Sequence, residues 1–321
     1  MKKKILLLSG DPNSVNSELI FKTWKKLNYS TRKKIYLISS YDLIKAQFKK
    51  LKYSIKIVKV KNLKENIKGN NLKIINLDIN FKNPFNISKK NRSKFVLNCL
   101  NTAHKLALGK EVVGVINCAI DKKLLKKKGT GVTEYLSTKC GVKNDKEVMM
   151  IRNKNLSVVP ITTHIDVKQV SGKINSRKIV NKIKTVQTWF KDQFKKKPKI
   201  GILGLNPHNA ELRRDSEERK IIIPAIKKLS NLRYNIKGPL VSDTLFINDY
   251  KKFDVIVGMF HDQVLSPFKA IYKFNAINIT LGLKYLRVSP DHGTAVNLIG
   301  KNKADIKSLI ECINFLNKSK K

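Results

Sequence analysis

Three of the five histidines of this chain stand just after apolar, strand-like runs. His164 follows LSVVPITT, His208 follows KIGILGLNP and His261 follows DVIVGMF. Ligands of open α/β sheets collect outside the carboxyl ends of the strands, so three imidazoles delivered to that edge could converge on one metal ion. A single histidine near a strand end is more often a solvated or hydrogen-bonded loop residue. The spacing matches no short zinc signature, so the pattern by itself supports a metal-dependent enzyme only weakly.

The elements that would position these histidines follow an α/β rhythm. Apolar runs of four to eight residues alternate with longer amphipathic stretches, which is typical of parallel βαβ units. The length of 321 residues favours two lobes, at about 100–200 residues per domain. The predicted strands are 4–8, 34–38, 55–60, 112–116, 156–162, 199–203, 254–259 and 276–280. The predicted helices include 92–108, 176–194, 216–229 and 304–316.

Composition and missing signatures exclude several classes of protein. The formal charge of +44 comes from dispersed lysines without an RNA- or DNA-binding motif, so we expect no specific nucleic-acid partner. The four cysteines form no CxxC pair, and the start MKKKILLLSGDP reads as a buried strand rather than a signal peptide. No long uncharged apolar run indicates a membrane partner. We therefore expect a cytoplasmic protein, and the absence of GxGxxG argues against an ordinary Rossmann dehydrogenase.

Four stretches carry a resemblance that covers essentially the whole chain. They are VVPITTHI, GLNPHNAE, GPLVSDTLF with GMFHDQVLSPFK, and NITLGLKYLRVSPDHGTA. In this order they resemble the 4-hydroxythreonine-4-phosphate dehydrogenases of pyridoxal phosphate biosynthesis. The resemblance implies two α/β/α lobes around a cleft, as in isocitrate and isopropylmalate dehydrogenases. It implies a cofactor-side lobe of residues 1–125 with 276–321, and a metal, substrate and dimerisation lobe of residues 126–275.

The same resemblance implies the site residues. The divalent-metal ligands would be His164, His208 and His261. Substrate contacts would come from Thr133, Lys269, Asn278 and Arg287. Lys269, Asp262 and Asp243 would complete the catalytic machinery. The two aspartates would orient ligand imidazoles or tune the metal, although they could instead cap helices or turns.

The segment DHGTAVNLIG resembles the adenosine-binding loop of the isopropylmalate and isocitrate dehydrogenases. His292, Gly293, Thr294 and Ala295 would then lie against NAD. The alternative is a plain strand-to-helix turn with Asp291 as its cap.

The implied reaction is NAD-dependent and needs a divalent metal (Zn, Mg or Co). It oxidises the C3 hydroxyl of 4-phosphooxy-L-threonine and releases carbon dioxide to give 3-amino-2-oxopropyl phosphate. The resemblance also implies a homodimer with the active site at its interface. Three alternatives stay open: a dehydrogenase of 4-phosphothreonate or 4-phosphoerythronate, a non-catalytic basic binding protein, and a phosphate acyltransferase.

The chain departs from the family pattern in four places. The pattern G-D-P-x-G-I-G-P-E is GDPNSVNSE here, with Ser14, Val15 and Asn16 in the glycine-rich stretch. The pattern G-H-T-E is GVTE, so Val132 replaces a substrate-contacting histidine. The run T-x-P-x-x-K is NCAIDK, which keeps Lys122, and the glycine-rich stretch after LNPH is NAELRRDSEE. These changes predict a shifted substrate or a lowered activity.

Overall fold

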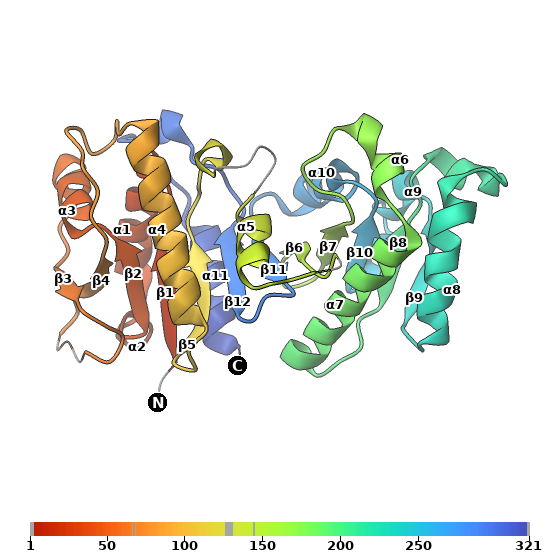
Figure 1. Cartoon of the computed structure of the whole chain (residues 1–321), viewed down its shortest axis with the longest axis horizontal. Helices are drawn as coiled ribbons and strands as arrows, with labels where there is room; N and C mark the ends of the chain where they lie inside the picture. Colours follow the sequence, from red (N-terminus) through yellow and green to blue (C-terminus); the bar gives the residue numbers. More distant parts are fainter. Residues whose placement is uncertain (1–2, 66, 68, 126–130, 144, 320–321) are drawn as a thin grey trace. The chain divides into compact units, whose positions relative to one another are not determined.

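The computed structural model describes residues 3–65, 67, 69–125, 131–143 and 145–319. The chain forms two compact units, Met1–Lys139 with Lys284–Lys321, and Cys140–Leu283 (Figure 1). The expected lobe boundary at residue 126 lies outside the described residues. Helix α5 contacts α4 and falls in the first unit, and β11 pairs with β6 and falls in the second. The observed boundaries therefore lie further along the chain than 125 and 275.

The first unit is built on a parallel sheet. Its strands run in the order β3-β4-β2-β1-β5-β12. Their bounds are β1 Lys4–Leu8, β2 Ile35–Ser39, β3 Ile57–Val60, β4 Leu72–Asn76, β5 Val112–Asn117 and β12 Leu286–Pro290. Strands β1, β2 and β5 are buried along almost their whole length, because helices cover both faces of the sheet.

The helices of this unit are amphipathic and pack on those faces. They are α1 Asn16–Lys26, α2 Tyr29–Arg32, α3 Tyr41–Lys50, α4 Lys89–Ala107, α5 Val132–Lys139 and α11 Lys307–Lys318. Ser88 caps α4 by accepting a hydrogen bond from the Asn91 amide, and the predicted apolar stripe of α4 is buried from Phe95 to Ala107, with Leu106 half-buried. Helix α4 crosses the near side of β1 and β5, and α11 packs behind β5 and β12 (Figure 1).

The second unit has a mixed sheet in the order β11-β6-β7-β10-β8-β9. The prediction of mainly parallel strands is confirmed, except that β6 runs antiparallel to both β7 and β11. The strand bounds are β6 Val148–Arg152, β7 Ser157–Pro160, β8 Ile200–Leu203, β9 Ile236–Leu240, β10 Val255–Gly258 and β11 Ile277–Leu281. The helices are α6 Val170–Lys173, α7 Ser176–Phe194, α8 Ile223–Asn231, α9 Ser242–Leu245 and α10 His261–Tyr272. The helix expected at 216–229 begins later, after a π-helical turn over Glu218–Ile222.

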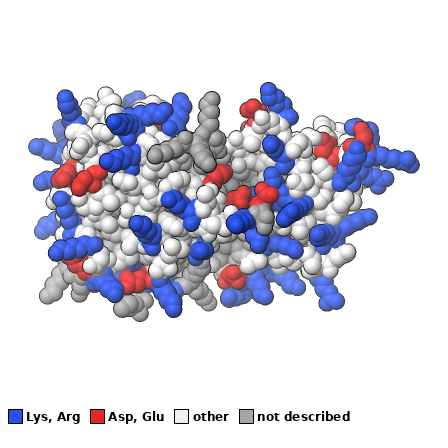
Figure 2. Space-filling model, viewed as in Figure 1, with Lys and Arg blue, Asp and Glu red and all other residues white. Residues whose placement is uncertain are grey.

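The distribution of surface charge and the burial of the cysteines agree with what the sequence predicts. Lys and Arg side chains are spread over the visible faces of both units rather than gathered in one patch (Figure 2). The cysteines Cys99, Cys118, Cys140 and Cys312 are all buried, and no disulfide joins them within the residues that the structure describes. Among the described residues, no helix is long and apolar enough to cross a membrane.

Lys73 on β4 gives a pH-dependent test of the first unit. Its side chain is 7% exposed, its Nζ lies 4.0 Å from the Tyr36 ring centroid, and burial, with help from Lys4 and Lys33, lowers its pKa from 10.5 to about 8. Between these two values the unfolded chain holds more protons than the folded chain, so the stability of the wild type rises with pH. We expect the free energy of unfolding of Lys73→Met, relative to wild type, to fall from pH 8 to pH 10.5. Urea denaturation across this window checks it, with exposed Lys59→Met as the control; parallel curves for Lys73→Met and wild type would contradict it.

Candidate active site

Two predicted metal ligands meet at one edge of the second sheet. Strands β7 and β10 are parallel neighbours, with Pro160 opposite Gly258, so His164 and His261 leave the sheet side by side. Their ring centroids are 5.8 Å apart, with an angle of 41° between the rings. Two imidazoles on one ion have centroids about 5–6 Å apart, given metal–nitrogen distances of about 2.0–2.1 Å. This pair can therefore supply two ligands to one divalent ion.

His261 is oriented by the residue that follows it. Its Nδ1 lies 2.7 Å from Asp262 Oδ1, which leaves Nε2 available for a metal. A carboxylate on the far nitrogen fixes the tautomer of a ligating histidine and makes it more basic. Asp243, the other predicted aspartate, is exposed in the first turn of α9, a position typical of a helix-capping acid.

His208 follows β8, which pairs with β10 on the side away from β7. Residues His208–Leu212 all have positive φ, between 45° and 56°. Left-handed backbone costs about 1–2 kcal/mol per residue for side chains other than glycine. Over the parts of the chain that the structure describes, no three His, Cys, Asp or Glu side chains form a group that could hold a metal. The structure therefore assembles two of the three predicted ligands.

The chain before His208 is tied down by side chains that the sequence did not single out. Glu218, fully buried, accepts hydrogen bonds from Leu205 N (2.7 Å), Asn206 N (2.9 Å) and Asn206 Nδ2 (3.0 Å). Burial raises the pKa of Glu218, but these hydrogen bonds outweigh burial and hold the pKa below its usual range. Gln263, two residues after His261, donates to the Gly204 carbonyl at 2.7 Å. The sequence could have indicated a role for Asn206, because Asn206 belongs to the LNPH motif that contains His208.

Arg287 is the buried cation of the first unit. It is 3% exposed on β12, and its Nε donates to Asn117 Oδ1 at 2.6 Å, while its Nη1 lies 3.5 Å from Thr133 Oγ1. The pairing of Arg287 with Val115 on β5 places Asn117 two residues on, and therefore on the same face. Burial lowers the pKa of Arg287 to about 10, so the guanidinium remains charged at neutral pH. A buried cation such as this one can bind a phosphate or carboxylate.

The other predicted substrate contacts lie in the second unit. Asn278 is half-buried on β11, and its Oδ1 is buried without a hydrogen-bond partner among the described residues. Lys269 lies on α10, about 12 Å along the helix axis from His261, with its Nζ 5.7 Å from the Phe274 ring centroid. Both can offer polar atoms to a ligand.

The predicted cofactor loop follows β12. The His292 Nε2 atom is buried and, in the described part of the chain, has no hydrogen-bond partner, while His292 Nδ1 lies 3.0 Å from the Gly293 carbonyl oxygen. A Cβ added at Gly293 would meet no protein atom within 4 Å. Ala295 has a φ of 44° at the start of the turn Val296–Leu298. The space beside the Gly293 backbone is open to a ligand, whereas the buried His292 Nε2 would have to become exposed before it could contact one.

The altered N-terminal loop packs against this cofactor loop. Val15 N donates to Thr294 O at 3.1 Å. Residues Ser14, Val15 and Asn16 all have negative φ, so their conformations do not require glycine. Asn16 Nδ2 donates to Ala119 O at 2.8 Å and so bridges the ends of β1 and β5. A side-chain hydrogen bond therefore holds the loop at one of the positions where the family pattern has glycine.

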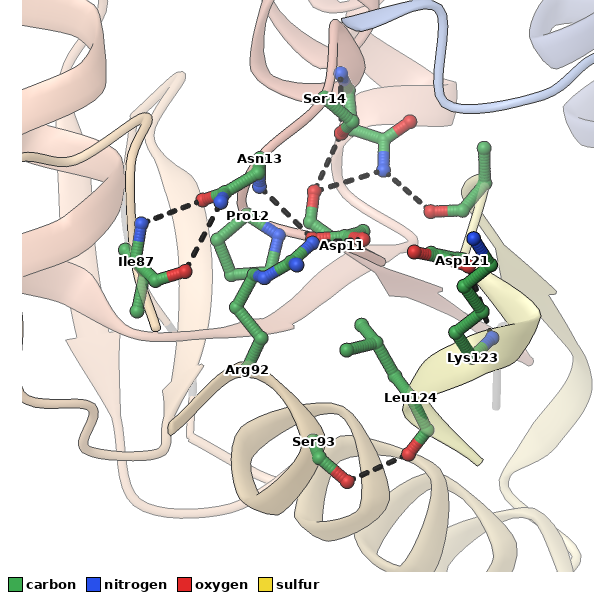
Figure 3. A network of polar contacts seen from close by, with 12 residues as sticks. Asp11, Pro12, Asn13, Ser14, Ile87, Arg92, Ser93, Asp121, Lys123 and Leu124 are labelled. Carbon is green, nitrogen blue, oxygen red and sulfur yellow. Dashed lines mark hydrogen bonds and ion pairs between the residues drawn. The ribbon is translucent and has the colours of Figure 1, made fainter. Parts of the chain in front are cut away.

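A polar network holds the start of the same loop (Figure 3). Arg92 Nη1 binds both carboxylate oxygens of Asp11, at 3.1 and 2.9 Å. Asn13 exchanges two hydrogen bonds with the backbone of Ile87, at 3.0 and 3.1 Å. Burial raises the pKa of Asp11, although Asn13 N and Arg92 act to lower it. The network fixes the loop onto α4 and the segment before it.

Comparisons with known proteins cover the whole chain. Residues 31–316 match the family described as pyridoxal phosphate biosynthetic protein PdxA. The chain is 38% identical to the 4-hydroxythreonine-4-phosphate dehydrogenase of Sulfurihydrogenibium sp., over 97% of both proteins, and 34% identical to that of Aquifex aeolicus, over 98% of both. A crystal structure of a 4-hydroxythreonine-4-phosphate dehydrogenase from Burkholderia phymatum superposes with a TM-score of 0.81 at 26% identity, covering 100% of this chain and 99% of that one.

Proposed function

Because the chain belongs to the family of the pyridoxal phosphate biosynthetic protein PdxA, we propose that it is a 4-hydroxythreonine-4-phosphate dehydrogenase. It transfers hydride from C3 of 4-phosphooxy-L-threonine to NAD, releases the hydroxyl proton, and then loses carbon dioxide from the resulting β-keto acid. The product is 3-amino-2-oxopropyl phosphate. The observation that carries this proposal is the His164–His261 pair, with centroids 5.8 Å apart, at the carboxyl ends of β7 and β10.

We assign the metal to His164 and His261, with His208 as the third ligand. A divalent ion held there would act as a Lewis acid that lowers the pKa of the substrate hydroxyl and favours decarboxylation. Asp262 holds the His261 imidazole in the ligating tautomer. The turn His208–Leu212 is left-handed throughout, and within the described residues His208 does not join the pair in a group of three. We also propose the homodimer, to be checked by sedimentation of the purified protein.

The substrate and the cofactor are assigned to the remaining predicted residues. Arg287, held by Asn117 and close to Thr133, binds the phosphate or the carboxylate as a cation. Lys269 and Asn278 supply further polar contacts, and His292 with Gly293, Thr294 and Ala295 receives the adenosine part of NAD. The test is NADH production by the purified protein, with and without divalent metal. Absence of metal-dependent NADH from every phosphorylated hydroxy acid tested would contradict the proposal.

A shifted substrate, 4-phosphothreonate or 4-phosphoerythronate, is the second candidate function. The observation in its favour is Val132, which begins α5 next to Thr133 and cannot hydrogen-bond through its side chain. The same NADH assay run on all three substrates ranks the two candidates.

Restoring the imidazole tests which substrate the site serves. We expect Val132→His to raise kcat/KM for 4-phosphooxy-L-threonine by about one to two orders of magnitude, since a hydrogen bond to a charged group contributes about 1.5–3 kcal/mol. Steady-state kinetics of the variant and of Val132→Ala, which adds no polar group, measure the gain. If Val132→His leaves this substrate unchanged and impairs another, Val132 is an adaptation to that other substrate.

A further inference from the structure

Glu218 lies at the centre of the contacts that hold the turn after β8. The carboxylate is fully buried and uses both oxygens: Oε1 accepts from Leu205 N and Asn206 N, and Oε2 accepts from Asn206 Nδ2. Neutral donors of the turn thus surround the carboxylate, and no ion pair of Glu218 is found in the portion of the chain that the structure describes. A structural role alone would not require a charged group here, because burying a carboxylate is costly.

The same turn is tied from the opposite side to the helix that begins with His261. Gln263 donates to Gly204 O at 2.7 Å and accepts from Met259 N at 2.6 Å, so it links the end of β8 with the end of β10. A Cβ at Gly204 would stand 2.1 Å from Asn209 Oδ1 and 3.1 Å from Glu218 Oε1. The backbone at 204–206 is therefore clamped tightly, immediately before Pro207 and His208.

The hydrogen-bonded segment 204–206 is followed almost directly by the left-handed segment His208–Leu212. Residues 204–206 are fixed, whereas the next stretch, His208–Leu212, is left-handed throughout. A change of conformation that relieves this strain must begin after Asn206. The hydrogen bonds of Glu218 and Gln263 to residues 204–206 therefore fix the position and direction of the backbone that leads to His208.

We propose that Glu218 is a positioning residue for His208: by holding the backbone of Leu205 and Asn206, it fixes the point from which the His208 side chain can approach the His164–His261 pair. The inference rests on the proposed metal site. Glu218 touches neither substrate nor metal in this role. The charge of Glu218 matters because both carboxylate oxygens accept hydrogen bonds, from three donors in all. A glutamine amide has only one acceptor oxygen, and its NH₂ group is itself a donor.

The test is titration of the purified full-length protein with Co²⁺, followed by calorimetry and by the visible absorption spectrum, which reports the number of ligands. We expect Glu218→Gln to bind Co²⁺ about tenfold to a hundredfold more weakly, with a changed spectrum, as for other residues that orient metal ligands. Glu218→Asp, which keeps the charge, should recover part of the affinity. Glu217→Gln is the matched control, since Glu217 contacts the Asn206 side chain but not the backbone, and it should bind Co²⁺ like wild type.

Wild-type affinity and spectrum in Glu218→Gln would overturn the inference, as would an equal loss in Glu217→Gln. Should Glu218→Gln not fold, Glu218→Asp decides: its shorter side chain cannot keep all three hydrogen bonds, so it should bind Co²⁺ more weakly than wild type, and wild-type affinity in Glu218→Asp overturns the inference. A wild type that binds Co²⁺ but makes no NADH contradicts only the proposed function. A wild type that does not bind Co²⁺ overturns the inference as well.

Discussion

His261→Ala is expected to keep its fold and to lose both bound divalent metal and NADH production. Its imidazole begins α10 at the edge of the sheet and is only partly buried, so its removal leaves the core intact. A metal ion contributes several kcal/mol of charge stabilisation, and we therefore expect activity to fall by at least about three orders of magnitude. Metal content by mass spectrometry, together with NADH absorbance, measures both effects.

His104→Ala is the matched control for this variant. His104 belongs to α4 of the first unit and lies 3.1 Å from the Tyr285 hydroxyl through its Nδ1. The control should keep its metal and its turnover. Undiminished metal content in the His261→Ala protein would rule out His261 as a ligand.

Arg287→Met should lower kcat/KM by about two to three orders of magnitude and should lower the melting temperature only moderately. The substitution removes the buried cation that we assign to substrate phosphate or carboxylate, and loss of one partner of a buried charge pair costs about 2–5 kcal/mol. The substitution also leaves the buried Asn117 Oδ1 without its donor, which costs about 1–3 kcal/mol of folding stability, while removal of a buried, desolvated charge offsets part of this cost. Steady-state kinetics and thermal unfolding of the same preparation separate the two effects.

Arg152→Met is the control, because Arg152 is a half-buried arginine that lies among the rings of Phe190 and Phe194 in the second unit. It should change stability and leave kcat/KM near that of wild type. If Arg287→Met keeps the kcat/KM of the wild type, Arg287 does not bind the substrate.

Most strands with continuous apolar runs could be predicted from the sequence. The runs at 4–8, 112–116 and 254–259 correspond closely to β1, β5 and β10. Strands β4, β6, β9 and β12 were not predicted. The apolar run of β6 was missed, whereas β4, β9 and β12 carry residues that disfavour a buried strand: Lys73, the Gly238-Pro239 pair and Arg287. These residues are accommodated by tertiary contacts, such as the hydrogen bond from Arg287 to Asn117 on the neighbouring strand, which no local pattern encodes.

The positions of the candidate metal ligands at strand ends could be predicted from the sequence, but the local backbone around His208 could not. The strand rhythm predicts that the histidines leave one sheet edge, and the neighbouring strands β7, β10 and β8 agree with it. The backbone of His208 could not be foreseen, because five consecutive left-handed residues without glycine contradict local preference. Glu218 could not be singled out because it lies in the charged run RRDSEERK, which is typical of a solvent-exposed segment. In the folded protein the Glu218 side chain is nevertheless buried.

The loop Asp11–Asn16 has a consequence for how this chain can change over evolutionary time. Its conformation is shared among Asp11 with Arg92, Asn13 with Ile87, and Asn16 with Ala119. Single reversions toward the glycine-rich family pattern affect only part of this network: Asn16→Gly would remove the hydrogen bond to Ala119 O, whereas Asp11 already belongs to the pattern and Asn13 stands at its variable position. The Ile87 and Ala119 partners are backbone atoms, which any residue supplies, so a chimera with a relative would need only Asp11 and Arg92 to be kept together.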